Sequence, residues 1–218
     1  MTGFRKRHFA ILLCILLVGL SACNIDFTPK PIPPAFPGGA PLPVSFSEVP
    51  YTPGLWNDYG QSICPSYDPQ YLQCRANCYA YALNFMQTGP YFHTLQPGEL
   101  SGHTFTEFDV DRDRIVQLVR LDAQVAGFTF VEAERDVACA SGTYKVALVI
   151  DPFAPDYHWY RQNPDGTWSG KSGLSQATDK DASGQTIVDP QTANRNYRQW
   201  GLNYSEFGGY YCIGSPWR

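Results

Sequence analysis

The chain has 218 residues and a formal net charge of −4, with 44% hydrophobic, 15% aromatic and 17% charged residues. This composition predicts a well-filled core and excludes a disordered chain. An acidic chain without a basic stripe also argues against nucleic acid as a partner.

Residues 1–22 predict a secretory signal peptide. Three basic residues (5–7) precede an apolar run at 9–20, which is shorter than the roughly 20 residues that a membrane-spanning helix needs. The segment Leu20-Ser21-Ala22-Cys23 resembles the lipobox of bacterial lipoproteins, in which the signal is cut before the Cys and that Cys is lipidated. The resemblance implies membrane attachment through lipid on Cys23. An ordinary cleaved signal peptide is the alternative.

The mature chain implied by this resemblance carries 13 Lys and Arg against 20 Asp and Glu, a net charge of −7. Anionic lipid repels such a chain, so acyl chains rather than charge should hold it to a membrane. In the best-known sorting system an Asp after the lipidated Cys retains a lipoprotein in the inner membrane, whereas here Asn24 follows Cys23. The resemblance therefore implies a bacterial cell-envelope protein of the outer membrane, facing the periplasm or the cell surface.

Residues 23–54 predict a proline-rich tether. Nine of the eighteen prolines lie between Phe27 and Pro53, a density that denies helix and favours an extended, semi-rigid spacer. The alternative is an arm that packs over the domain through residues 44–46 or 55–56. Residues 55–218 are of ordinary size for one domain.

The remainder predicts a helix-then-strand order. Residues 78–87 lack β-branched side chains, are apolar on nearly every face and precede Gly89-Pro90, which predicts a buried helix. Residues 111–126 show helical spacing of apolar side chains and stop at Gly127. The predicted strands cover 128–132, 144–151, 157–162, 167–171 and 209–213. Helices packed on an antiparallel sheet form an α+β fold.

The sequence Asn163-Pro164-Asp165-Gly166 predicts a three-residue hairpin loop with a bulge, because Pro favours the first corner and Gly the left-handed residue. The implied register sets Tyr160 opposite Gly170 and His158 opposite Ser172. Alternation then places five residues on one face of the hairpin: His158, Tyr160, Trp168, Gly170 and Ser172.

The predicted domain contains five cysteines: Cys64, Cys74, Cys78, Cys139 and Cys212. Exported domains normally pair their cysteines, so an odd number leaves one free thiol, for which we favour Cys78. Bridges Cys64–Cys74 and Cys139–Cys212 are the favoured pairing among three that the sequence allows. No Cys-x-x-Cys or His-x-x-x-His pair occurs, so neither a metal nor another cofactor is expected.

Cys78 is the best candidate for chemistry because it stands where the first helix should begin. Free N–H groups and a partial positive charge at a helix start favour a thiolate, and His158 provides a base. In this hypothesis Cys78 is the nucleophile and His158 takes its proton, while Asn77 helps to polarise the scissile carbonyl and Ser172 helps to orient the base.

A Cys at the head of a buried helix, followed by a strand that opens with a His, resembles the papain-like cysteine hydrolases. The lipoprotein setting is similar to that of the NlpC-type cell-wall endopeptidases. Segments 77–84, 96–98, 156–161 and 168–173 also resemble an uncharacterised family of bacterial secreted proteins, over most of residues 74–212. The resemblance implies a papain-like α+β domain that hydrolyses an amide or peptide bond, with peptidoglycan or peptide as substrate. A His usually stands in that family where this chain has Gly170, which removes the group that would orient the base.

The alternative to the enzyme is a non-enzymatic binding or structural lipoprotein on the same fold. In that interpretation Cys78 is a small buried hydrophobe and Asn77 is only the N-cap of the helix. The tryptophans at 159, 168 and 200 predict packing in the sheet, with a carbohydrate or peptide groove as the alternative.

Overall fold

The computed structural model describes residues 41–56, 76–85, 95–173 and 175–215. The predicted signal peptide, the lipobox-like segment with Cys23 and the predicted Cys64–Cys74 bridge lie outside the described residues. Within the described ranges, no helix is both long and apolar enough to cross a membrane.

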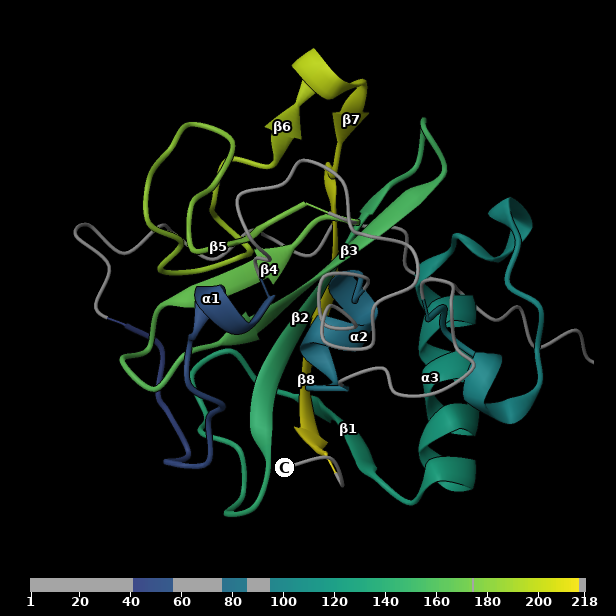
Figure 1. Ribbon diagram of the computed structural model, residues 1–218, viewed down its shortest axis with the longest axis horizontal. Helices are drawn as coiled ribbons and strands as arrows, with labels where there is room; N and C mark the ends of the chain where they lie inside the picture. The colour runs from purple at the N-terminus through teal and green to yellow at the C-terminus, as the bar shows by residue number, and fades with distance from the viewer. Residues whose placement is uncertain (1–40, 57–75, 86–94, 174, 216–218) are drawn as a thin grey trace, which may run out of the picture. The chain divides into compact units, whose positions relative to one another are not determined.

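The main sheet has six antiparallel strands in the order β1-β8-β2-β3-β4-β5 (Figure 1). A separate pair, β6 with β7, forms a short hairpin. The strands are β1 (Thr129–Ala133), β2 (Tyr144–Asp151), β3 (Asp156–Gln162), β4 (Trp168–Lys171), β5 (Ala177–Thr178), β6 (Asn196–Tyr197), β7 (Leu202–Asn203) and β8 (Glu206–Gly214). The five predicted strands are present, and the two-residue strands β5, β6 and β7 were not predicted.

The β3–β4 hairpin has the predicted register. Its loop closes through hydrogen bonds from the Asn163 N–H to the Thr167 carbonyl (2.8 Å) and from the Gly166 N–H to the Asn163 carbonyl (2.9 Å). Gly166 has a φ of 81°, the left-handed conformation that the loop requires. The pairs Gln162–Trp168 and Tyr160–Gly170 are confirmed.

The first predicted helix is shorter than expected. Helix α2 (Cys78–Ala82) ends because Asn84 adopts a left-handed φ of 54°. The Asn84 N–H bonds to the Tyr81 carbonyl (3.1 Å) and the Phe85 N–H to the Ala80 carbonyl (2.8 Å), which together form a Schellman motif. After Gly, Asn is the residue that most readily adopts this left-handed conformation. The apolar pattern of the sequence did not predict a helix end at Asn84.

The second helix, α3 (Arg112–Ala126), matches its prediction. The Asp111 carboxylate accepts the N–H groups of Asp113 (3.0 Å) and Arg114 (3.1 Å), which caps the start of the helix. Gly127 ends α3 with a φ of 75°. A short helix, α1 (Pro53–Trp56), lies before α2 in the chain. Two helices packed on an antiparallel sheet confirm the predicted α+β class.

The sheet separates two hydrophobic clusters. One contains Tyr79 of α2, Val119 of α3 and Trp159 of β3, so both helices cover the same face. The other contains Tyr160, Trp168, Ile187 and Tyr204, and the chain between β5 and β8 supplies its outer layer. Successive residues of β3 therefore point to different layers, which decides the geometry of the site below.

The predicted bridge between Cys139 and Cys212 is present, and Cys78 is the free thiol among the three cysteines that the structure describes. Residues 41–54, which the sequence assigned to the tether, pack on the domain in the structure. Leu42 is buried, its carbonyl accepts Nε2 of Gln162 (2.9 Å), and the Ser45 hydroxyl donates to the Thr143 carbonyl (2.6 Å).

Candidate functional site

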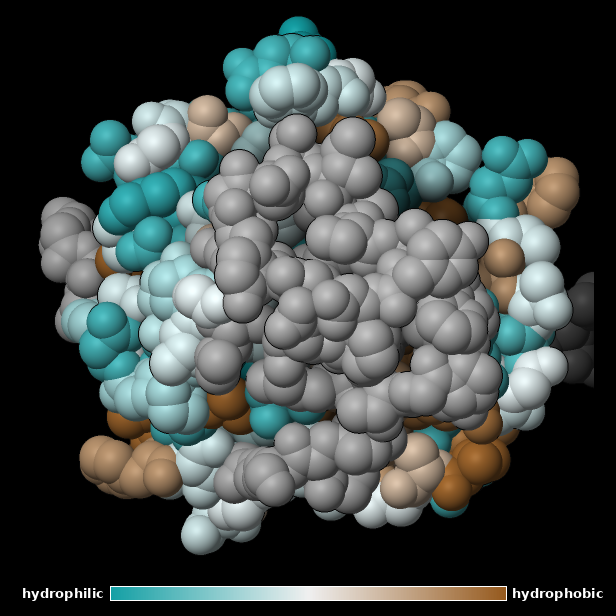
Figure 2. Space-filling view, viewed as in Figure 1, coloured by the Kyte–Doolittle hydropathy of each residue, from teal (hydrophilic) through white to brown (hydrophobic). Residues whose placement is uncertain are grey.

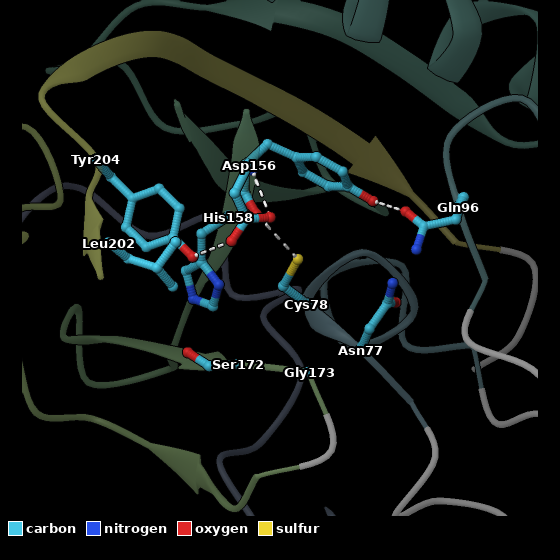
Figure 3. A pocket seen from close by; sticks show the side chains of 10 residues that line it. Asn77, Cys78, Gln96, Asp156, His158, Ser172, Gly173, Leu202 and Tyr204 are labelled. Atoms are coloured by element: carbon cyan, nitrogen blue, oxygen red, sulfur yellow. Dashed lines mark hydrogen bonds between the residues drawn. The ribbon is translucent and has the colours of Figure 1, made fainter. Parts of the chain in front are cut away.

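The four residues predicted for the site, Asn77, Cys78, His158 and Ser172, all line one cavity of about 360 Å³ (Figure 3). It lies where β3 begins and β4 ends. The start of α2 and strand β7 also contribute to its lining. The fold therefore brings the four predicted residues together, although their detailed arrangement differs from the prediction.

Cys78 is buried, with 6% of its surface exposed, and its thiol donates to the Tyr157 carbonyl at a sulfur–oxygen distance of 3.8 Å. Burial raises the pKa of the thiol to about 12. The prediction of a lowered thiol pKa is therefore wrong, because loss of solvation outweighs the effect of a five-residue helix. At neutral pH the sulfur carries its proton.

His158 lies on the opposite side of β3 from the layer that contains α2. Its neighbours Tyr157 and Trp159 pack with Cys78 in the helix-side cluster. The imidazole instead contacts the rings of Tyr160 (centroids 4.7 Å apart) and Tyr204 (5.8 Å). No hydrogen bond between Cys78 and His158 is seen among the described residues.

The His158 ring is neutral at physiological pH because burial lowers its pKa to about 3. Only 4% of the residue is exposed, and neither ring nitrogen has a hydrogen-bond partner in the described part of the chain. Packing between tyrosine rings, rather than a polar group, fixes the orientation of the imidazole. Cys78 and His158 are therefore both neutral and lie on different sides of β3. They do not form the preformed thiolate–imidazolium pair of an activated cysteine.

Gly170 explains where the imidazole rests. A Cβ at this position would overlap Nε2 of His158 and approach Cδ1 of Tyr160 to 3.1 Å. A larger residue there would displace the ring from its observed position. Ser172 lines the cavity beyond the end of β4 and is exposed.

Asn77 is the N-cap of α2. Its Oδ1 accepts the Ala80 N–H (3.0 Å), and its Nδ2 donates to the Leu95 carbonyl (2.6 Å). Both ends of the side chain therefore have structural partners, and the N-cap interpretation is confirmed.

The other six lining residues were not predicted for the site, and three of them carry polar side chains of interest: Gln96, Asp156 and Tyr204. The Tyr157 hydroxyl donates to Oε1 of Gln96, whose Nε2 has no partner in the described ranges. Asp156 accepts the Tyr204 hydroxyl (2.8 Å) and the Tyr157 N–H (2.9 Å), and burial raises its pKa. Their adjacency depends on contacts far apart in sequence, which no local pattern reveals.

The segment that carries Gln96 is anchored by a buried carboxylate on α3. Asp122 accepts the Tyr79 hydroxyl (2.8 Å) and the N–H groups of Gly98 (2.7 Å) and Ser101 (2.9 Å). One side chain thus joins α2, α3 and the 98–101 loop. This anchoring fixes one wall of the cavity relative to Cys78.

Lys171 is a cation whose charge interacts with the Cys78 thiol. Gly170 pairs with Tyr160, so Lys171 is level with Trp159 on the helix side of the sheet, where Cys78 meets β3. The lysine is fully buried and donates to the Gly173 carbonyl (3.0 Å). Burial lowers its pKa to about 8, while the negative charge of an ionised Cys78 would oppose that shift.

No group of three or more His, Cys, Asp or Glu side chains in the described ranges is arranged to hold a metal ion. The polar side chains that line the cavity act as hydrogen-bond donors and acceptors. Asp156 is the one acidic residue among them, and none of those described is Lys or Arg.

The fold and the cavity define an α+β domain with a buried, protonated thiol beside a polar pocket. No family model matches the chain, and no solved structure matches it. Insoluble matrix shell protein 1 of the mollusc Ruditapes philippinarum is 36% identical over 144 residues, which cover 66% of this chain and 82% of that protein. The chain belongs to the same protein family as this shell matrix protein.

Proposed function

We propose that this chain is an exported binding or structural protein whose domain attaches to an extracellular matrix or cell envelope without hydrolysing it. The observation that carries the proposal is the state of the site. Cys78 is protonated and bonded to a backbone carbonyl, while the neutral His158 packs on the other side of β3. Acyl transfer needs a thiolate and a base within reach of it.

Two further observations support the proposal. The relative is named as an insoluble matrix shell protein, which describes a structural component. The Cys139–Cys212 bridge fits an oxidising compartment, in agreement with the signal peptide proposed at residues 1–22. We further propose the lipid anchor at Cys23, which rests on the lipobox, with a bacterial outer membrane as the site of attachment.

A cysteine-dependent amide or peptide hydrolase is the second candidate. It is favoured by one specific observation, namely that Cys78 and His158 line the same cavity. A thiol at the first residue of a buried helix on an antiparallel sheet also supports the papain-like comparison. In this candidate a substrate would have to draw the two groups together before proton transfer.

Incubation of the mature, full-length chain with peptidoglycan sacculi separates the two candidates. The binding protein should sediment with an insoluble polymer that it recognises, and Cys78→Ser should neither abolish sedimentation nor alter the release of free amino groups. The binding proposal would be contradicted if the wild type released amino groups and both Cys78→Ser and His158→Ala lost this release. Tyr51→Phe serves as a control for a substitution outside the cavity.

A further inference from the structure

Two exposed aromatic side chains lie on loops that supply or lead into lining residues of the polar cavity. Phe153 is 87% exposed in the β2–β3 turn, which leads directly to Asp156. Trp200 is 75% exposed in the β6–β7 hairpin, which supplies Leu202 to the cavity. Figure 2 shows apolar residues over the β2–β3 turn beside the more hydrophilic β6–β7 hairpin.

A buried carboxylate fixes these two loops to each other. Oδ1 of Asp151 accepts the N–H groups of Phe153 (2.9 Å) and Ala154 (3.1 Å), and its Oδ2 accepts the Asn203 N–H (2.5 Å). Because one side chain holds both loops, the aromatic rings stand on a rigid frame rather than on independent loops. Loops whose backbone is already held in place lose little conformational entropy when a ligand binds to them.

Several uncharged polar groups that line the cavity have no hydrogen-bond partner in the described part of the chain. Nε2 of Gln96 and both ring nitrogens of His158 have no partner in the described part of the chain, and His158 is more than nine-tenths buried. The Ser172 hydroxyl adds a group that both donates and accepts. These groups line the cavity without a protein partner within the described ranges, so they are available to a ligand that carries both donors and acceptors.

The charge and size of the cavity narrow the ligand class. A phosphate or carboxylate would lack a cationic partner, because none of the described lining residues is Lys or Arg. A cation would find only Asp156, whose oxygens already accept bonds from Tyr204 and Tyr157. A volume of about 360 Å³ is near the lower end of ligand pockets and suits one substituted ring.

We infer that the cavity binds a neutral sugar unit of a polysaccharide, with the rings of Phe153 and Trp200 packing against the adjoining units. Sugar hydroxyls both donate and accept, which matches Gln96, His158 and Ser172. The apolar C–H face of a sugar ring packs on an aromatic face with loss of exposed apolar surface. This inference rests on the proposed binding function and names its ligand class.

Calorimetric titration of the mature, full-length chain with an N-acetylglucosamine hexamer tests the inference, with a glucose hexamer and a free peptidoglycan stem peptide as the other probes. At least one hexamer should bind. Trp200→Ala and Phe153→Ala should each raise its Kd by about tenfold, the equivalent of one aromatic contact of about 1.4 kcal/mol. The matched control is Phe108→Ala, since Phe108 is 89% exposed but lies in the 3-10 helix Glu107–Asp109, outside the cavity.

If Trp200→Ala and Phe153→Ala bind a hexamer with the same Kd as Phe108→Ala and the wild type, the assignment of the site is overturned. Binding to the stem peptide and to neither hexamer would overturn the sugar inference, while the binding function would stand. Cleavage of a probe that depends on Cys78 would instead refute the binding function itself. Sedimentation with insoluble chitin and with peptidoglycan sacculi then distinguishes the two sources of an N-acetylglucosamine unit.

Discussion

Gly170→Ala tests whether the His158 imidazole rests on the bare backbone of β4. Ala normally stabilises a protein relative to Gly by about 0.4–1 kcal/mol where the backbone conformation permits, because the unfolded chain loses freedom. Here the added Cβ would overlap Nε2 of His158 and approach Tyr160 to 3.1 Å. Overpacking in a buried layer costs about 1–3 kcal/mol, so we expect the substitution to lower the free energy of unfolding by about 1–2 kcal/mol.

Urea denaturation of four proteins gives the coupling energy: the wild type, Gly170→Ala, His158→Ala and the double variant. With the imidazole removed, the Cβ has lost its closest neighbour, so Gly170→Ala should then be nearly neutral. A coupling of at least about 1 kcal/mol is expected between these sites. Gly54→Ala is the matched control, because a Cβ there meets nothing within 4 Å, and it should not destabilise the protein. Additive effects of Gly170→Ala and His158→Ala would refute the packing described for the site.

Three further predictions concern the fold and its anchor. Replacing both Cys139 and Cys212 by Ser opens a loop with a sequence separation of 73 and should lower the free energy of unfolding in urea by about 4 kcal/mol, and an unchanged midpoint would contradict the role of the bridge. Because burial lowers the folded pKa of His158 to about 3, below its unfolded value of about 6.5, its contribution is complete above pH 6.5 and is lost as the pH falls toward 3. The pH dependence of stability in that window should therefore be shallower in His158→Gln, and identical slopes would show that the imidazole titrates normally. Mass spectrometry of the mature N-terminus should find acyl chains on Cys23, and an unmodified Cys23 would exclude the lipid anchor.

Local chemistry was sufficient to predict much of this fold. Helix α3 has a capping Asp111 and a terminating Gly127, and the β3–β4 register follows from the turn at Asn163-Pro164-Asp165-Gly166. The early end of α2 was missed because Asn84 takes a left-handed conformation that the apolar pattern around it does not signal. The strands β5, β6 and β7 were missed because two residues are too few to show alternation.

Local sequence features predicted only part of the geometry of the site. The sequence placed Cys78 at a helix start and His158 on the same hairpin face as Gly170, and both placements are confirmed. Which face of the sheet α2 covers depends on packing across the whole domain, and this choice separates the thiol from the imidazole. The thiol pKa was misjudged for a related reason, since the burial of Cys78 follows from tertiary contacts rather than from its position on the helix.

Alkylation of Cys78 by iodoacetamide tests the central claim, that the thiol is protonated and independent of His158, most directly. The mature native chain is labelled at intervals from about pH 5 to 9, and the peptide that contains Cys78 is quantified by mass spectrometry. With a pKa of about 12, the labelling rate should rise roughly tenfold for each pH unit and reach no plateau in this range, with the same profile in His158→Ala. A plateau near neutral pH that moves upward in His158→Ala would contradict the account and establish an activated thiol.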